Sequence, residues 1–382
     1  MAGTGTTRVV NGADAGGGAG ARLVDQLSLP LLARIFGLDE GVSPYLLLST
    51  AAQVRSTLPH LVLSVAEREG AALGSGSRDT LARARGRASG YADVMRTVVA
   101  RAPSARIVKG ASMAASYPRA LLRPVGDADI WVPERTELWR AAAAIVAERP
   151  MADVRITLYG TPAPFPVVTV QWPSEDPWLD KPMKAELFPT PLAGNGRAVG
   201  PRMLDPGAGQ TVHDLMALCE EGFQRPFNPK DIADVLVLAD SPLPPTGVLV
   251  AATAEYALAP ELARLLDYAA RWCDIGSLEE LRLAVADEAR RERDRRDRWR
   301  RSRVPDHVTN PVRRWLAYGM PVPSVVLNRV DPATRGDDAS YEDFVGDHLI
   351  ARTPLGDFLA TTREVVSAQD ARAARAYLAS SV

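Results

Sequence analysis

The chain has 382 residues, of which 46% are hydrophobic, so it is long enough for about two or three domains with buried cores. A formal net charge of −1 excludes a general attraction to nucleic acid or to an anionic membrane. The chain has no apolar run near the roughly 20 residues that span a bilayer, no signal-peptide pattern, and two cysteines without metal-ligand or disulfide spacing. These features predict a cytoplasmic protein with no membrane partner.

The first part of the chain is expected to be helical after a loose start. Residues 1–21 are rich in glycine, alanine and threonine and predict a disordered tail. Residues 22–102 predict a helical N-terminal region. Ser43 and Pro44 suit the N-cap and the first turn of a helix, and apolar residues recur through 46–65. No residue of this region shows recognisable chemistry.

The pattern changes over 103–240, where strands alternate with helices. A glycine turn, Lys109-Gly110-Ala111-Ser112, precedes the apolar run that contains Asp127 and Asp129. An alanine-rich helix and then three strands are expected at 134–148, 154–158, 167–172 and 183–188. Helix is expected again over 211–240, with a break at 225–229. Residues 241–382 predict a mostly helical C-terminal region with short strand candidates near 325–327, 348–352 and 358–361.

Asp127 and Asp129 form the most informative pair in the chain. On a strand, positions i and i+2 project from the same face, about 6 to 7 Å apart. Two carboxylates so placed repel each other unless a cation lies between them. Mg²⁺ typically takes one or two carboxylates together with substrate phosphates. The pair therefore predicts a magnesium site; the alternative is a solvated strand edge after a glycine turn.

The order of motifs around this pair resembles a known group of enzymes. The ordered residues are Lys109-Gly110, Ser112, Tyr117-Pro118, Arg123 and Asp127-Ala128-Asp129. This set resembles bacterial nucleotidyltransferase-like proteins of the DNA polymerase beta-type superfamily and, more weakly, abortive-infection-type nucleotidyltransferase toxins. The resemblance implies an α+β fold, with a nucleotidyltransferase-type mixed sheet core at 103–240 and helical additions on both sides.

The same resemblance assigns roles to the residues of the turn and the strand. Asp127 and Asp129 are expected to be catalytic metal ligands. Lys109, Gly110 and Ser112 are expected to cradle the triphosphate, since glycine permits close backbone approach and a helix start offers amides. Arg123 is expected either to contact phosphate or to pair with the carboxylates and fix the strand.

The third carboxylate of the superfamily is missing from its usual place. In the most similar group the neighbouring strand often reads apolar-Glu-apolar-His-Trp, whereas this chain has Thr169 and Gln171 within 168–172. Glu186, which has apolar flanks, is expected to replace it as a catalytic metal ligand on the next strand. A solvent-facing Glu186 is one alternative, and a degenerate site that binds nucleotide without turnover is another.

A second set of residues lies in the helical element that follows the core. Lys230-Asp231 with Asp234 resembles the corresponding element of both related groups, which implies that Lys230 touches phosphate; a surface charge at a helix start is the alternative. Cys219 stands where a lysine or histidine is expected, which puts full activity in question. His213 is expected to be a polar helix residue and not a catalytic base.

Lysine is scarce, and its positions support the site. The only lysines are Lys109, Lys181, Lys184 and Lys230, and the other 41 of the 45 basic residues are arginine. Where arginine is the default, a retained lysine is more plausibly a compact point charge. This strengthens Lys109, while an ordinary surface role stays open for Lys181 and Lys184.

An arginine-rich segment closes the helical part of the C-terminal region. Between Glu288 and Arg303 there are nine arginines against four acids. Clustered arginines neutralise nucleic-acid phosphates, but the interleaved Glu292, Asp294 and Asp297 favour a solvated helix with internal ion pairs.

The expected function is Mg²⁺-dependent transfer of a nucleoside monophosphate from a nucleoside triphosphate to an acceptor hydroxyl, with release of pyrophosphate. A small-molecule or peptide acceptor is favoured over RNA. The alternatives are a nucleotide-binding pseudoenzyme, a toxin-like nucleotidyltransferase acting on RNA, and a helical scaffold in which Asp127 and Asp129 are incidental.

Overall fold

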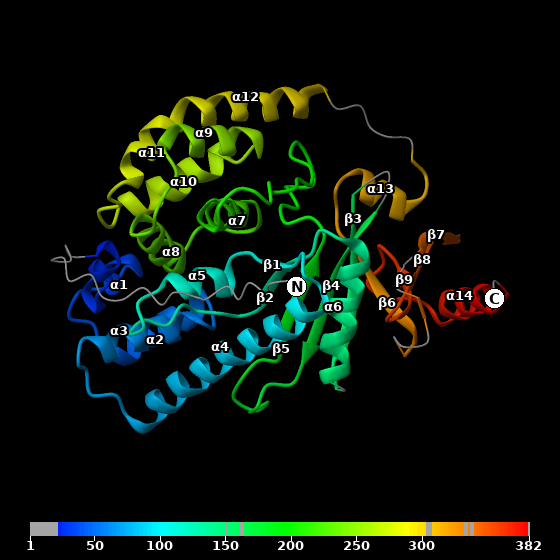
Figure 1. Ribbon diagram of the computed structural model, residues 1–382, viewed down its shortest axis with the longest axis horizontal. Helices are drawn as coiled ribbons and strands as arrows, with labels where there is room; N and C mark the ends of the chain where they lie inside the picture. The colour runs from blue at the N-terminus through cyan, green and yellow to red at the C-terminus, as the bar shows by residue number, and fades with distance from the viewer. Residues whose placement is uncertain are drawn as a thin grey trace, which may run out of the picture.

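The computed structural model describes residues 22–149, 151–160, 164–302, 308–331, 335–336 and 340–380 (Figure 1). In these residues the chain has a mixed α+β fold built on one nine-stranded sheet. The tail expected at 1–21 lies outside the described residues. No helix among those described combines the length and the hydropathy needed to cross a membrane.

The N-terminal region is helical, as its sequence predicts. It comprises the 3₁₀ turn η1 (Leu23–Gln26) and helices α1 (Leu29–Ile35), α2 (Pro44–Val54), α3 (Leu58–Arg68) and α4 (Ser75–Arg101). The Ser43 side chain accepts the amide of Leu46 at 3.3 Å, and Pro44 occupies the first turn of α2. The local cap therefore determines where α2 begins.

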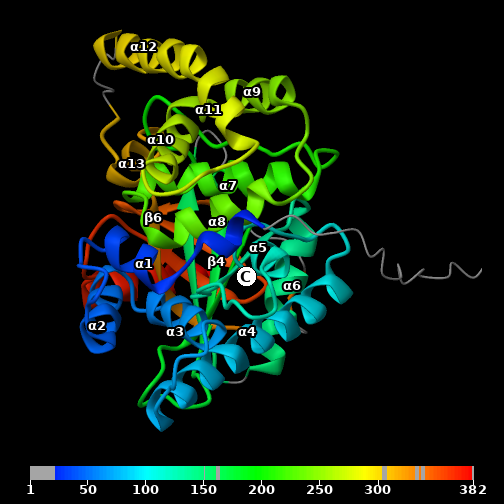
Figure 2. The ribbon, with the colours of Figure 1, turned by 90° about the vertical axis from the view of Figure 1, so that its left-hand side faces the viewer.

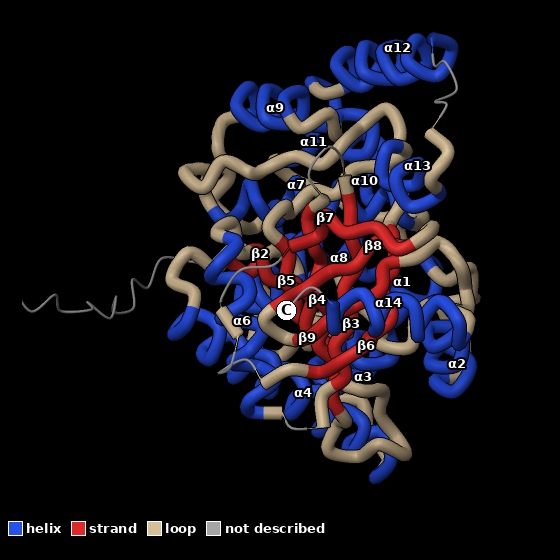
Figure 3. The backbone as a smooth tube through the Cα atoms, turned by 90° about the vertical axis from the view of Figure 1, so that its right-hand side faces the viewer, coloured by secondary structure: helices blue, strands red, loops and turns tan. Residues whose placement is uncertain are grey.

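The sheet combines strands from the predicted core and from the C-terminal region. Its order is β1-β2-β5-β4-β3-β6-β9-β8-β7, and the strands are drawn red in Figure 3. The first five strands are β1 (Arg106–Ile107), β2 (Ala128–Trp131), β3 (Asp153–Tyr159), β4 (Phe165–Trp172) and β5 (Met183–Phe188). β2 and β5 run parallel, whereas the other pairings between described strands are antiparallel.

The C-terminal region is less separate from the core than its sequence suggests. Strands β6 (Val322–Arg329), β7 (Ser340–Val345), β8 (His348–Thr353) and β9 (Gly356–Ala360) continue the same sheet. β6 pairs with β3 through Thr157 and Leu158, so the sheet continues across the boundary expected at residue 240. The short strands expected near 325–327, 348–352 and 358–361 correspond to β6, β8 and β9, whereas β7 was not expected, because short strands show their partners only after long-range pairing.

Helices cover both faces of the sheet next to β2. α4 and α6 (Arg135–Glu148) pack on one face, where they share a buried cluster with Ile130. On the other face, Trp131 is buried with side chains of α5 (Gly110–Ser116), α7 (Gln210–Gln224) and α8 (Pro229–Ala239). Figure 2 shows α7 and α8 near the middle of the molecule. Because strand residues alternate between faces, Asp129 projects to the same side as Trp131.

The remaining helices form an outer layer and a C-terminal cap. They are α9 (Thr246–Glu255), α10 (Ala259–Ala270), α11 (Leu278–Ala284), α12 (Ala286–Ser302), α13 (Pro311–Ala317) and α14 (Ala368–Ser380). α12 carries the arginine run and lies at the top of Figures 1 and 2. Its arginines pair with acids one turn away, as Arg295 with Glu292 at 2.6 Å, and Arg296 reaches Glu261 of α10 at 2.8 Å. The prediction of an ion-paired helix is confirmed.

A buried ionic network fastens α8 to the chain that leads into β2. Asp234, fully buried on α8, accepts two hydrogen bonds from Arg123 at 2.8 Å and one from Lys230 at 2.9 Å. The Tyr117 hydroxyl donates to the same carboxylate at 2.6 Å. Burial alone would raise the pKa of Asp234, but the Arg123 and Lys230 charges hold that pKa well below its usual range. Removing this anion would leave two buried cations poorly compensated, because Arg123 would keep the Gly110 carbonyl and Lys230 only the more distant Asp231 carboxylate, at 3.6 Å.

We predict that Asp234→Ala lowers the free energy of unfolding by about 3–5 kcal/mol, measured by urea denaturation at pH 7. Because the pKa is depressed in the folded protein, the contribution of Asp234 is fully present above the unfolded value of 3.8 and declines as the pH falls below it.

The matched control is Asp267→Ala on α10, whose exposed ion pair with Arg282 should contribute less than about 1 kcal/mol. Equal losses of stability in the two variants would contradict a central role for Asp234.

Candidate functional site

A cavity of about 530 Å³ lies where β2 and β5 meet α7 and α8. This volume is within the usual range for small-molecule sites. Seven of the eight site residues proposed from the sequence line it: Lys109, Gly110, Arg123, Asp127, Asp129, Glu186 and Lys230. Ser112 is the exception. The structure therefore brings together residues that are up to 121 positions apart in the chain.

The three proposed carboxylates come from two adjacent strands. Asp129 of β2 and Glu186 of β5 are direct partners in the parallel register. Asp127 precedes β2, and its neighbour Gly126 is anchored because its carbonyl accepts the Tyr91 hydroxyl at 2.7 Å. Thr169 of β4 lies opposite Glu186 in the next pairing. Glu186 is thus placed beside Asp129. Thr169, at the position where the proteins that the motif resembles usually have a glutamate, lies one strand further away, on β4.

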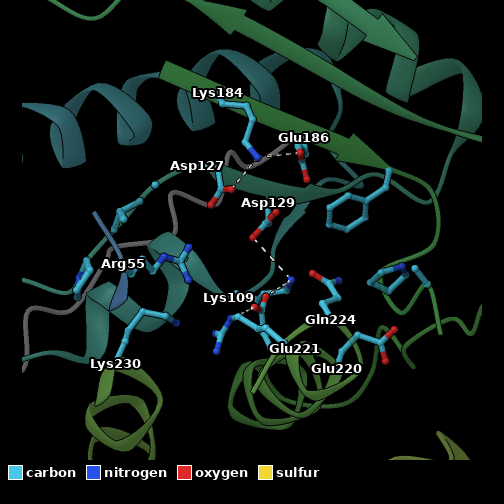
Figure 4. Close-up of a pocket in the computed structure, with 18 of the residues that line it drawn as sticks. Arg55, Lys109, Asp127, Asp129, Lys184, Glu186, Glu220, Glu221, Gln224 and Lys230 are labelled. Carbon is cyan, nitrogen blue, oxygen red and sulfur yellow. Dashed lines mark hydrogen bonds and ion pairs between the residues drawn. The ribbon is translucent and has the colours of Figure 1, made fainter. Parts of the chain in front are cut away.

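Lys184 lies between two of these carboxylates. Its ammonium is 3.0 Å from Asp127 Oδ2 and 2.9 Å from Glu186 Oε1, as the dashed lines in Figure 4 show. Partial burial by itself would lower the pKa of Lys184, but Asp127 and Glu186 raise it overall. Lys184 therefore carries a positive charge and neutralises the pair from within the chain.

Lys109 performs a similar task on the opposite wall. Its ammonium donates to Glu221 Oε1 of α7 at 2.8 Å and is 3.9 Å from Asp129 Oδ2. Burial opposes ionisation of Glu221, yet the Lys109 charge and hydrogen bond hold the pKa of Glu221 at about 2. The hydrogen bond of Lys109 is thus directed to Glu221, and Asp129 receives only its longer-range attraction.

Asp129 is consequently the carboxylate with the most perturbed titration in the cavity. Burial raises its pKa most; the Lys109 charge opposes this increase, and the negative charges of Asp127 and Glu186 add to it. The resulting pKa is about 7, compared with 3.8 for an ordinary aspartate. A group that titrates near neutrality in a cavity is typical of functional sites, although structural clusters show it too.

The glycine turn is held by a carboxylate of the protein itself. Lys109, with φ 60°, is the N-cap of the short helix α5, and Gly110 begins the helix with φ 32°. Asp214 Oδ1 of α7 accepts the Lys109 amide at 3.2 Å and lies 2.5 Å from the Ser112 hydroxyl. Ser112, expected to contact phosphate, is therefore bound to Asp214 outside the cavity. The Lys109 side chain and Gly110 remain exposed to the cavity.

Arg123 and Lys230 line the cavity, but their charges are largely satisfied. Both hydrogen-bond to Asp234, and Arg123 also donates to the Gly110 carbonyl at 3.0 Å. Of the two roles expected for Arg123, the pairing role involves Asp234 and not Asp127 or Asp129. The sequence could not identify Asp234 as this partner, because the two residues lie 111 positions apart in the chain.

The cavity also contains residues that the sequence did not single out. Arg55, just after α2, lines it, and its guanidinium forms no hydrogen bond or ion pair with any residue that the structure describes, while its amide caps α2 by donating to the Ala51 carbonyl. Glu220, Glu221 and Gln224 of α7 line the opposite part (Figure 4). The scarcity of lysine could have identified Lys184, because three of the four lysines line this cavity. Arg55 is one of many arginines and carries no such signal.

Two other residues of α7 lie away from the chemistry. Cys219 is fully buried in the hydrophobic core and does not line the cavity. The side chains of α7 that do line it are Glu220, Glu221 and Gln224. His213 is buried, with Nε2 2.7 Å from the Asp205 carbonyl and its ring edge-on to Trp131. This agrees with the expectation that His213 is a helix residue and not a base.

The carboxylates of the cavity are of the kind that binds a divalent cation, but the Lys184 ammonium already contacts two of them. Carboxylate oxygens are the preferred protein ligands of Mg²⁺. Within the described ranges, no three acidic, histidine or cysteine side chains converge as a ready-made metal cluster. The Lys184 ammonium lies against Asp127 and Glu186 and stands in for such a cation. Asp127, Asp129 and Glu186 thus offer the oxygen ligands that suit Mg²⁺, with the Lys184 ammonium lying between Asp127 and Glu186.

Comparisons of the chain with protein-family models, with curated proteins and with solved structures find no match.

The raised pKa of Asp129 predicts a specific dependence of stability on pH. The folded protein binds this proton more tightly than the unfolded chain, so ionisation of Asp129 destabilises the fold. Relative to Asp129→Asn, the wild type should lose stability as the pH rises from about 3.8 to about 7 and then level off.

Urea unfolding in metal-free buffer across this pH range measures the difference, with Asp267→Asn as an exposed control. A wild-type minus Asp129→Asn difference that is flat with pH would contradict the proposed environment of Asp129.

Proposed function

We propose that this protein is a Mg²⁺-dependent nucleotidyltransferase, which transfers a nucleoside monophosphate from a nucleoside triphosphate to an acceptor hydroxyl and releases pyrophosphate. The observation that carries the proposal is the placement of Asp129 and Glu186 on two adjacent strands, with Asp127 just before the first of them, in a cavity that is also lined by basic side chains. The ordered motif that resembles nucleotidyltransferases supports the same reaction class.

The carboxylates and basic residues have complementary roles in this proposal. Asp127, Asp129 and Glu186 would hold Mg²⁺, which when bound offsets the charge of the triphosphate. Lys109 and Arg55 would bind phosphate oxygens, and Arg55 suits this role because its guanidinium has no hydrogen-bond or ion-pair partner among the described residues. Lys230 and Arg123 would add positive potential while they keep α8 in place. Gly110 would allow the phosphates to approach the backbone.

The acceptor hydroxyl would be oriented from the β5 side of the cavity. Glu186 Oε1 accepts a hydrogen bond from Lys184, and we assign Oε2 to the proton of the acceptor hydroxyl. Tyr159, Val167 and Phe188 line the same cavity and provide apolar surface for a base or a sugar.

A small-molecule or peptide acceptor is favoured over RNA by the arrangement of α12. Five of its eight arginines pair with acids of their own helix, as in Arg295–Glu292 and Arg300–Asp297, and one of the five, Arg296, also pairs with Glu261 of α10. α12 supplies no residue to the cavity lining. These ion pairs would have to be exchanged for phosphate contacts before the helix could hold RNA.

A nucleotide-binding pseudoenzyme is the second candidate. The specific observation in its favour is the Lys184 ammonium, which engages Asp127 and Glu186 directly. If this contact persists when nucleotide is bound, the carboxylates cannot serve a metal, and binding without turnover would result.

We predict that wild-type protein transfers label from α-labelled nucleoside triphosphates in the presence of Mg²⁺, and that Asp127→Ala/Asp129→Ala lowers the rate by about a hundredfold or more. Transfer to pooled small-molecule, peptide and tRNA acceptors is measured by label incorporation and pyrophosphate release.

Asp267→Ala is the control for an aspartate far from the cavity and should retain full activity. Nucleotide binding by the wild type without transfer to any pool would reject the enzyme and favour the pseudoenzyme.

We further predict that Arg55→Ala weakens the binding of a fluorescent nucleoside triphosphate by about tenfold, because one charge-assisted contact to phosphate is lost. Arg55→Lys should retain part of the affinity.

Arg101→Ala, at the exposed end of α4, is the matched control and should bind like the wild type. Unchanged affinity in Arg55→Ala would show that the N-terminal region does not contact the phosphates.

A further inference from the structure

Lys184 is built into the carboxylate site by its position on β5. It precedes Glu186 by two residues, so both side chains project from the same face of the strand. Its backbone is fixed by pairing with Gln171 of β4 and by its amide, which donates to the Tyr91 hydroxyl at 3.3 Å. The side chain is 32% exposed, so the ammonium has a path toward solvent.

The contacts of Lys184 use the oxygens that a metal would use. One ammonium lies 3.0 Å from Asp127 Oδ2 and 2.9 Å from Glu186 Oε1, and so links β5 to the residue that directly precedes β2. Figure 4 shows Lys184 pointing between these carboxylates. A divalent cation that binds Asp127 and Glu186 at about 2.0–2.1 Å would repel an ammonium still in contact with both.

The second lysine of the cavity does not compete in the same way. Lys109 donates to Glu221 at 2.8 Å and remains 3.9 Å from Asp129. Its main acidic partner lies on α7, outside the Asp127, Asp129 and Glu186 set. The conflict with a bound cation therefore concerns Lys184.

The choice of lysine is informative in a chain where 41 of 45 basic residues are arginine. An ammonium is a compact charge on a flexible stem, so it can contact two carboxylates and also withdraw. An arginine would present a planar group suited to bidentate binding of one carboxylate.

We propose that Lys184 is the internal counter-ion of the carboxylate site, and that a divalent cation binds to Asp127 and Glu186 by displacing its ammonium. The inference rests on the proposed function, since it concerns the cation which that reaction requires. In the free protein the Lys184 ammonium holds the two carboxylates together by contacting both of them, and the site binds a divalent cation weakly as a result.

The test measures Mn²⁺ binding to the full-length, nucleotide-free protein by the electron paramagnetic resonance signal of free Mn²⁺. Lys184→Met should lower the dissociation constant for Mn²⁺ at least about tenfold, because a positive charge next to the metal position is removed. Lys184→Arg, which keeps the charge, should stay closer to the wild type.

Lys181→Met is the matched control, three residues away and exposed, and should change the constant by less than about twofold. Adding Glu186→Gln to Lys184→Met should reverse the gain. Circular dichroism establishes that each variant folds, and Lys184→Gln replaces Lys184→Met if the latter does not.

The outcomes separate the inference from the proposed function. Tighter Mn²⁺ binding in Lys184→Met but not in Lys181→Met supports the inference. An unchanged or weaker affinity in Lys184→Met overturns it, and the function survives if the wild type still transfers label. Failure of the wild type and of every variant to bind Mn²⁺ overturns the inference together with the metal-dependent function.

Discussion

The candidate site depends on the balance between clustered carboxylates and the few cations that reach them. Asp129 and Glu186 occupy adjacent strand positions, Asp127 directly precedes β2, and Glu221 of α7 lines the same cavity. Such a cluster is stable only if its negative charges are compensated or partly protonated. Lys184 contacts Asp127 and Glu186, and Lys109 hydrogen-bonds to Glu221. Within the part of the chain that the structure describes, Asp129 has no such close cation and keeps a raised pKa. The same balance that holds the free site together sets the condition under which a metal could enter it.

The surrounding fold keeps these charges in place through contacts between distant segments. Asp234 ties Arg123, at the entrance to β2, to α8, and Asp214 of α7 fixes the glycine turn. On the other side of the sheet, Tyr91 of α4 holds the Gly126 carbonyl next to Asp127. Several residues that a motif would assign to ligand binding are therefore held by contacts within the protein. Arg55, whose guanidinium has no partner among the described residues, comes from the end of α2 in the N-terminal region.

Local chemistry explains why much of the fold could be anticipated. The Ser43–Pro44 cap places the start of α2, and the apolar run of 183–188 coincides with β5. These signals act over a few residues and need no knowledge of distant contacts. The extension of the sheet by β6 to β9 was harder to foresee, because β6 joins β3 after a separation of more than 160 residues.

The amino-acid sequence by itself determined the main helices and core strands, the Asp127–Asp129 pair, and the choice of Glu186 as the third carboxylate candidate. Only the tertiary structure decided what each side chain contacts. It assigned Asp234 to Arg123, Asp214 to Ser112, and the Asp127–Glu186 pair to Lys184. It also brought Arg55 into the cavity. The reason is physical: helix caps and strand patterns are encoded within a few residues, whereas ion-pair partners are selected when distant elements pack and exclude water.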